Sequence, residues 1–196
     1  MVRQFSAVGQ GLMKVFFGAC LSAAYVLLNT TGLLLGLMPL RILSAVVCLA
    51  GFFLAYVGLT AAAVAESGYR RAIWCARLSA VAGLLAALLM DNPLLILALA
   101  LFRQCMDLIG IVVVCRVSGQ LMTDQHGEVY DGRGALTWKL SLLCGVGASL
   151  CGCASVIFLN EKLLLAAVTF YLILQTLERL VYMIFLYRSH NVFQSW

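Results

Sequence analysis

The chain has 196 residues, of which 64% are hydrophobic and only 11% are charged, with a formal net charge of +5. Soluble domains average roughly 45–50% apolar and about 25% charged residues. The mean hydropathy of +1.04 exceeds what a globule of this size can hide in its interior. These values exclude a disordered chain, a nucleic-acid-binding domain and a disulfide-stapled secreted module. They predict an integral membrane protein.

Long uncharged runs predict an all-α, polytopic bundle of about six transmembrane helices, because backbone polar groups in lipid must be satisfied within each segment. The chain 1–196 forms one transmembrane domain with short loops. The predicted spans are about 10–28, 42–65, 72–90, 93–117, 135–158 and 163–187. Asn29 and Pro39 interrupt the first run, so 29–41 stays open between a loop, a re-entrant or interfacial segment and part of a span.

The N-terminal segment is expected to stay as an anchor. Lys14 leaves too few apolar residues before Cys20 for the hydrophobic region of a cleaved signal peptide.

The distribution of basic residues predicts the orientation of the six spans, since cytoplasmic loops of membrane proteins carry an excess of Lys and Arg. Side B, opposite the N-terminus, holds only Arg41 and Lys162. The N-terminal side collects Arg3, Lys14, Arg70, Arg71, Arg77, Arg116, Arg133, Lys139, Arg179 and Arg188. The predicted location is the cell (plasma) membrane, with both termini cytoplasmic.

Small residues dominate the fifth predicted span. Gly145, Ser149 and Gly152 lie on or beside one small face of this helix, and such faces let helices associate closely in lipid. We predict that they serve helix packing, with Ala80, Gly83 and Ala87 of the third span as the partner face. The alternative is that these small residues line a passage for a substrate. The eight cysteines lie nearly all within spans, where they are expected to act as small packing residues and not as disulfides or metal ligands.

Ionisable residues deep in a span are the costly ones. Arg103 is the eleventh residue of the fourth span, where insertion costs roughly 2.5–3.5 kcal/mol. Asp107 follows four residues later, about 6 Å along the same helix face, and Gln104 lies beside them. Arg103 and Asp107 can therefore pair and lower each other's cost.

The sixth span carries a matching polar stripe of Tyr171, Gln175, Glu178 and Tyr182. Arg179 points about 100° away from Glu178. The fourth and sixth spans run in the same direction and place Asp107 and Glu178 at similar depth. We therefore expect a shared polar interior in which two acids face one arginine, leaving one carboxylate free to hold a proton, a cation or a substrate amine.

The residues of this hypothetical binding site are Arg103, Gln104, Asp107, Gln175 and Glu178. The competing interpretation is purely structural. In it, a neutral Arg103–Asp107 pair orients the fourth span, while Glu178 and Arg179 reach the cytoplasmic interface.

The segment 119–134 is expected to be a solvated loop, although His126 lies near Asp124, Glu128 and Asp131. One histidine is too few for a metal site, and His190 is expected to be exposed in a polar tail. No motif of a membrane protease, zinc hydrolase or nucleotide-binding loop is found. We therefore predict no catalytic residues, no metal and no cofactor.

Two classes of function follow. In the first, the protein binds or transports a small solute or ion through the polar interior between the fourth and sixth spans. In the second, it is a non-catalytic membrane scaffold or accessory subunit. The expected partners are the lipid bilayer and other membrane subunits, with no nucleic acid.

Overall fold

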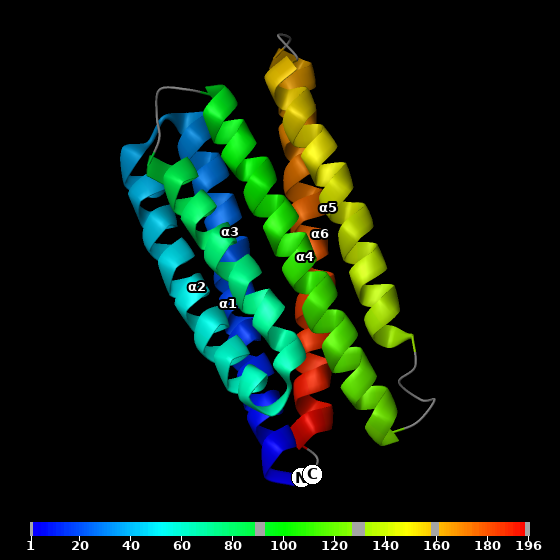
Figure 1. The fold of residues 1–196 in the computed structure, drawn as a ribbon. Coiled ribbons are helices and arrows are strands. Elements are labelled where there is room, and N and C mark those ends of the chain that lie inside the picture. Colours follow the sequence, from blue (N-terminus) through cyan, green and yellow to red (C-terminus); the bar gives the residue numbers. More distant parts are fainter. Residues whose placement is uncertain (1, 89–92, 127–131, 158–160, 195–196) are drawn as a thin grey trace.

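The computed structural model describes residues 2–88, 93–126, 132–157 and 161–194 (Figure 1). These residues form six α-helices and one short 3-10 helix. The helices are α1 (Val2–Leu35), α2 (Met38–Ala65), η1 (Ser67–Tyr69), α3 (Arg70–Leu88), α4 (Pro93–His126), α5 (Arg133–Ile157) and α6 (Glu161–Gln194). The all-helical prediction is confirmed. Residues 89, 90 and 158 of the predicted spans lie outside the described residues.

Five of the helices, all except α3, are long and apolar enough to cross a membrane. Their outward faces carry large apolar side chains such as Phe53, Leu143 and Leu150, each more than 60% exposed. Water would disfavour such a surface, whereas lipid tails accept it. Helix α3 includes Arg70, Arg71 and Arg77 within 19 residues, so the third span stays a prediction.

Most of the segment 29–41 belongs to the two helices on either side of it. Helix α1 continues to Leu35, and α2 begins at Met38. Gly36 ends α1 with a left-handed φ of 63°. The N–H of Leu37 donates to the Gly32 carbonyl at 3.0 Å, which satisfies a helix-end carbonyl as in a Schellman cap. A capped turn of two residues thus joins α1 to α2, so the part of 29–41 that forms a loop is limited to Gly36 and Leu37.

Helix α4 also runs beyond its predicted end and continues through His126. The first part of the expected loop 119–134 is therefore helical, and residues 127–131 lie outside the description. Ser118 is buried and shares a 2.7 Å hydrogen bond with the Tyr69 hydroxyl. Packing against the segment before α3 thus extends α4 past its apolar part.

Helix α6 continues to Gln194, so the expected polar tail is wrong and His190 is not exposed. His190 is only 9% exposed, and its Nδ1 lies 2.8 Å from the carbonyl oxygen of Gly9 in α1. Phe193 is fully buried in the same contact. The start of α1 and the end of α6 are consequently tied together at one end of the bundle (Figure 1).

The helices form a ring in chain order. Each helix packs against the next one along the chain, and α6 returns to pack against α1. Helices α4 and α6 make a smaller contact across the interior. Such a ring has an inner face, and side chains from α4 and α6 are directed into it.

The tightest helix pair, α1 with α2, depends on glycines that the sequence analysis did not single out. A Cβ on Gly58 would lie 2.4 Å from the Gly11 carbonyl oxygen, and one on Gly18 would lie 2.7 Å from the Gly51 carbonyl oxygen. Each helix repeats its glycine after seven residues, which is two helical turns. This spacing in both partners of a helical hairpin was the available signal for a close helix pair.

Candidate functional site

The polar side chains of α4 and α6 meet inside the ring. Five of them are 8% exposed or less, and the Asp107 side chain is 13% exposed. These five are Arg103 and Gln104 from α4, and Gln175, Glu178 and Arg179 from α6. We call these five residues and Asp107 the polar cluster. It unites all five residues of the hypothetical binding site.

Gln104 links the two helices through both ends of its amide. Its Nε2 donates to Glu178 Oε2 at 2.5 Å. Its Oε1 accepts from Gln175 Nε2 at 2.7 Å. A buried amide pays a desolvation cost unless both ends are paired, so this chain of bonds fixes the register between α4 and α6.

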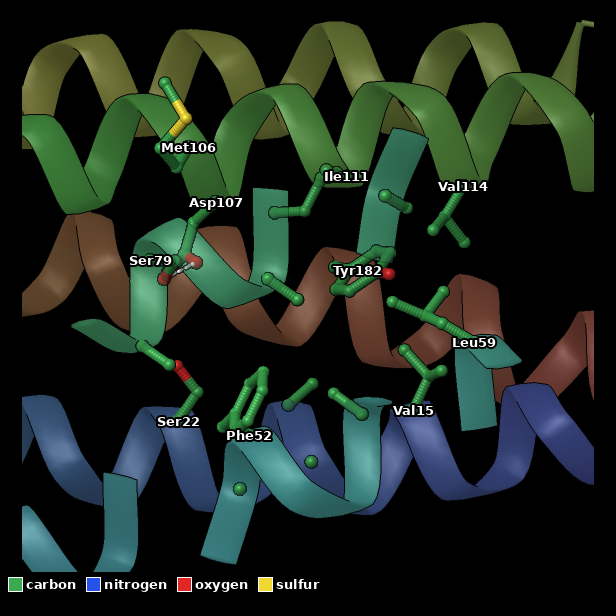
Figure 2. A pocket seen from close by; sticks show the side chains of 18 of the residues that line it. Val15, Ser22, Phe52, Leu59, Ser79, Met106, Asp107, Ile111, Val114 and Tyr182 are labelled. Carbon is green, nitrogen blue, oxygen red and sulfur yellow. Dashed lines mark hydrogen bonds between the residues drawn. The ribbon is translucent and has the colours of Figure 1, made fainter. Parts of the chain in front are cut away.

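Asp107 receives more partners than the sequence analysis expected. It forms an ion pair with the Arg179 guanidinium and accepts a hydrogen bond from the Ser79 hydroxyl of α3. Its distance to Arg103 Nε is 3.9 Å. Figure 2 shows the Ser79 hydroxyl and the Asp107 carboxylate meeting between their helices.

The expected geometry of Arg179 is corrected by this ion pair. Arg179 does not reach the membrane interface, because its guanidinium turns into the ring toward Asp107. Its Nε also lies 3.9 Å from Glu178 Oε1. Two arginines therefore face two carboxylates, and the predicted surplus of one carboxylate does not exist.

Arg103 is held by residues that the sequence analysis missed. Its guanidinium carbon lies 3.7 Å from the centre of the Tyr25 ring, a cation–π contact. Its Nη2 donates to the Ser22 hydroxyl at 3.3 Å. Gly83 leaves room for this guanidinium, because a Cβ there would lie 2.8 Å from Arg103 Nη1. Ser22 and Tyr25 are one helical turn apart, which was the only signal in the sequence.

Two cavities lie on opposite sides of the polar cluster. The proximal cavity, of about 100 Å³, is bounded by α1, α2, α3, α4 and α6 and includes Asp107 and Tyr182 among its lining residues. Figure 2 shows it in close-up. The distal cavity, of about 280 Å³, lies farther from the chain ends and extends along the first turns of α4 and α6. Arg103 and Arg179 line both cavities.

The distal cavity combines polar and apolar walls. Its polar part includes Gln104, Tyr171 and Gln175 beside the two arginines. Its apolar part includes aliphatic side chains of α1, α4 and α6, among them Leu33, Leu97, Ala100 and Val168. Polar groups gathered at one end of an apolar cavity are typical of sites for small amphipathic molecules.

The small face of α5 contributes to this arrangement, but its partner helix was predicted wrongly. Within the described residues α5 packs against α4 and α6 and makes no comparable contact with α3, the helix of Ala80, Gly83 and Ala87. A Cβ on Gly145 would lie 2.9 Å from Gln104 Nε2. Ser149 and Gly152 line the distal cavity. The predicted packing residues thus border the polar cluster.

All eight cysteines are free thiols, and the described residues contain no group of three or more His, Cys, Asp or Glu side chains that could hold a metal ion. Comparisons of the chain with protein-family models, with curated proteins and with solved structures found no match.

Proposed function

We propose that this protein, integral to a cell membrane with both ends of the chain cytoplasmic, binds a small solute bearing a negative charge inside the helical ring and moves it between the two cavities. The observation that carries the proposal is the position of Arg103 and Arg179, which line both cavities. The excess of basic residues at the end of the bundle that holds the chain ends supports the orientation.

The charge of the lining residues supports an anionic solute. Arg103 and Arg179 are the charged residues that line the distal cavity in the described part of the chain, whereas Asp107 lines only the proximal cavity. A solute entering the distal cavity would therefore meet guanidinium groups, which pair well with carboxylates and phosphates. This replaces the cation or amine that was expected when two carboxylates were thought to face one arginine.

The size of the distal cavity limits the solute. At about 30 Å³ for each water molecule of liquid, a volume of about 280 Å³ corresponds to roughly nine water molecules. A solute of about ten non-hydrogen atoms therefore fits. The aliphatic walls favour a short hydrocarbon chain, so octanoate is a suitable probe.

The polar cluster would act as the barrier between the cavities. Passage from one cavity to the other requires the Gln104–Glu178 hydrogen bond and the Asp107–Arg179 ion pair to rearrange. An anion bound to an arginine competes with the carboxylate that is paired with that arginine, so the solute itself would favour the rearrangement.

The test uses two variants of one helix. Ala100 lines the distal cavity, whereas Ala98 is exposed on the outer face of α4. Purified parent, Ala100→Phe and Ala98→Phe are unfolded thermally in a nonionic detergent with octanoate, octanol or octylammonium. A ligand at 100 times its Kd adds about 2.7 kcal/mol of stability. We expect octanoate to stabilise the parent and Ala98→Phe but not Ala100→Phe.

Partitioning of the probes into micelles affects both variants alike, so only the difference between them reports on the cavity. Equal responses of Ala100→Phe and Ala98→Phe to every probe would refute binding in the distal cavity. A cavity-dependent response to octylammonium and not to octanoate would keep the solute site and overturn its preference for anions.

The second candidate function is a scaffold or accessory subunit that associates with other membrane subunits. The balance of two arginines against two carboxylates favours a scaffold, because a neutral cluster is sufficient to hold helices in register without binding a solute. Replacing Asp107 and Arg179 together with leucine separates the two functions. A scaffold keeps its fold and its partner subunits, whereas a solute carrier keeps its fold and loses the response to octanoate.

A further inference from the structure

A third hollow, a groove, lies at the end of the bundle that holds the chain ends, and it differs in character from the two cavities of the ring. It encloses about 360 Å³ between the end of α4, the start of α5 and the last turns of α6. Arg133 and Arg188 are the charged residues that line it within the described part of the chain. We call it the basic groove.

The electrostatics of the basic groove favour an anion. Its two guanidinium groups come from different helices, so a phosphate between them could be bound from two sides. Arg133 is also the first residue of α5, where the helix dipole presents its positive end.

The remaining walls favour hydrocarbon. Val181, Ile184 and Phe185 of α6 and Leu136 of α5 line the groove. Leu136 is 62% exposed and Ile184 is 52% exposed, so the groove continues into the lipid-facing surface of the bundle. A soluble phosphate compound would leave these apolar walls uncovered, whereas an acyl chain would cover them.

The level of the groove within the bilayer is marked by Trp138, which follows the lining residue Thr137. Arg116 lies 5.0 Å and Lys139 lies 5.8 Å from the Trp138 ring centre. Tryptophan with basic neighbours is typical of the membrane–water interface. The groove is therefore at headgroup depth, at the end of the bundle where basic residues gather.

We infer that the basic groove binds an anionic phospholipid, with the phosphate between Arg133 and Arg188 and an acyl chain along Leu136 and Ile184. The cytoplasmic leaflet is rich in anionic lipids, and basic pockets between transmembrane helices on that side are suited to their headgroups. This inference does not depend on a solute in the ring.

The test compares lipids of equal chain length. Purified protein in a nonionic detergent receives dihexanoyl phosphatidylglycerol, dihexanoyl phosphatidylcholine or inorganic phosphate, and thermal unfolding is followed. The variants are Arg133→Gln, Arg188→Gln and the two combined. The matched control combines Arg70→Gln and Arg71→Gln, because both arginines are exposed and neither lines the groove.

We expect phosphatidylglycerol to raise the unfolding midpoint of the parent and of the control by several degrees. The combined Arg133→Gln and Arg188→Gln variant should lose this rise, and each single variant should lose part of it. All four arginines are exposed, so these variants are expected to fold.

Three results would overturn the inference. The first is an equal rise with phosphatidylcholine, which would show that the charge is irrelevant. The second is a full rise with inorganic phosphate alone, which would show that the acyl chain is irrelevant. The third is an equal loss in the Arg70→Gln and Arg71→Gln control, which would show a diffuse effect of surface charge.

Discussion

Asp107 of α4 and Arg179 of α6 form an ion pair inside the helical ring, 72 positions apart in the chain. Glu178, the neighbour of Arg179 in sequence, bonds instead to Gln104. Each carboxylate of the polar cluster thus has a different principal partner, and both partnerships cross from α4 to α6.

The Asp107–Arg179 pair should be strongly coupled in stability. Removing one member of a buried ion pair leaves a charge without compensation and costs about 3–5 kcal/mol, whereas apolar replacement of both is often close to neutral. Asp107→Leu and Arg179→Leu should each lower the free energy of unfolding by about that much, and the double variant by far less than the sum. A double-mutant cycle of unfolding in mild detergent measures the coupling. Additive losses would contradict the pairing.

The Gln104 amide should contribute to stability, because it bonds to two residues of α6. Gln104→Leu leaves Glu178 Oε2 and Gln175 Nε2 without their hydrogen-bond partner. Each unsatisfied buried group costs about 1–3 kcal/mol, so the variant should unfold several degrees below the parent. Gln120→Leu, at an exposed position of the same helix, is the control. A similar midpoint for both variants would show that the amide bridge adds no stability.

The close approach of α1 and α2 should make Gly58 sensitive to a single methyl group. Gly58→Ala would place its Cβ 2.4 Å from the Gly11 carbonyl oxygen, and such overpacking typically costs about 1–3 kcal/mol. Gly110→Ala is the control, since the nearest atom to its Cβ would be Cys75 Cβ, at an ordinary contact distance of 3.6 Å. We expect Gly110→Ala to be neutral or stabilising, because alanine is a better helix former by about 1 kcal/mol. Thermal midpoints of the two variants check the prediction, and equal midpoints would contradict it.

The contact between the two ends of the chain should contribute to stability. Phe193 is fully buried against α1, whereas Phe53 is 63% exposed on the outer face of α2. Phe193→Ala should cost about 3–5 kcal/mol as a buried large-to-small change, and Phe53→Ala much less. Unfolding of both variants in the same detergent measures the difference. An equal loss of stability in Phe53→Ala and Phe193→Ala would contradict a specific contribution from the contact between α6 and α1.

The helical class and the pairing of α4 with α6 could be predicted because each depends on properties within one segment. Uncharged runs in the sequence indicate the helices. The fourth and sixth spans run in the same direction and carry polar residues at similar depth, so Gln104 could be expected near Gln175 and Glu178. The direction of Arg179 could not be predicted in this way. A long arginine side chain reaches several positions around its helix, and the choice depends on which neighbour offers a carboxylate.

Helix ends were the least predictable part of the fold. Hydropathy reports where the apolar run stops, but α6 continues to Gln194 because His190 and Phe193 pack against α1. Likewise, the extension of α1 over Asn29 depends on the glycine cap at Gly36 and the turn into α2.

Composition and charge spacing by themselves determined a helical, membrane-compatible chain with costly polar residues at matching depths in two helices, because the transfer of each residue into lipid is a local property. Only the tertiary structure decided which charges pair, which helices touch α5, and that two arginines line cavities on both sides of the polar cluster. Those features depend on the closed order of the helices in the ring, which arises from packing between segments far apart in the chain.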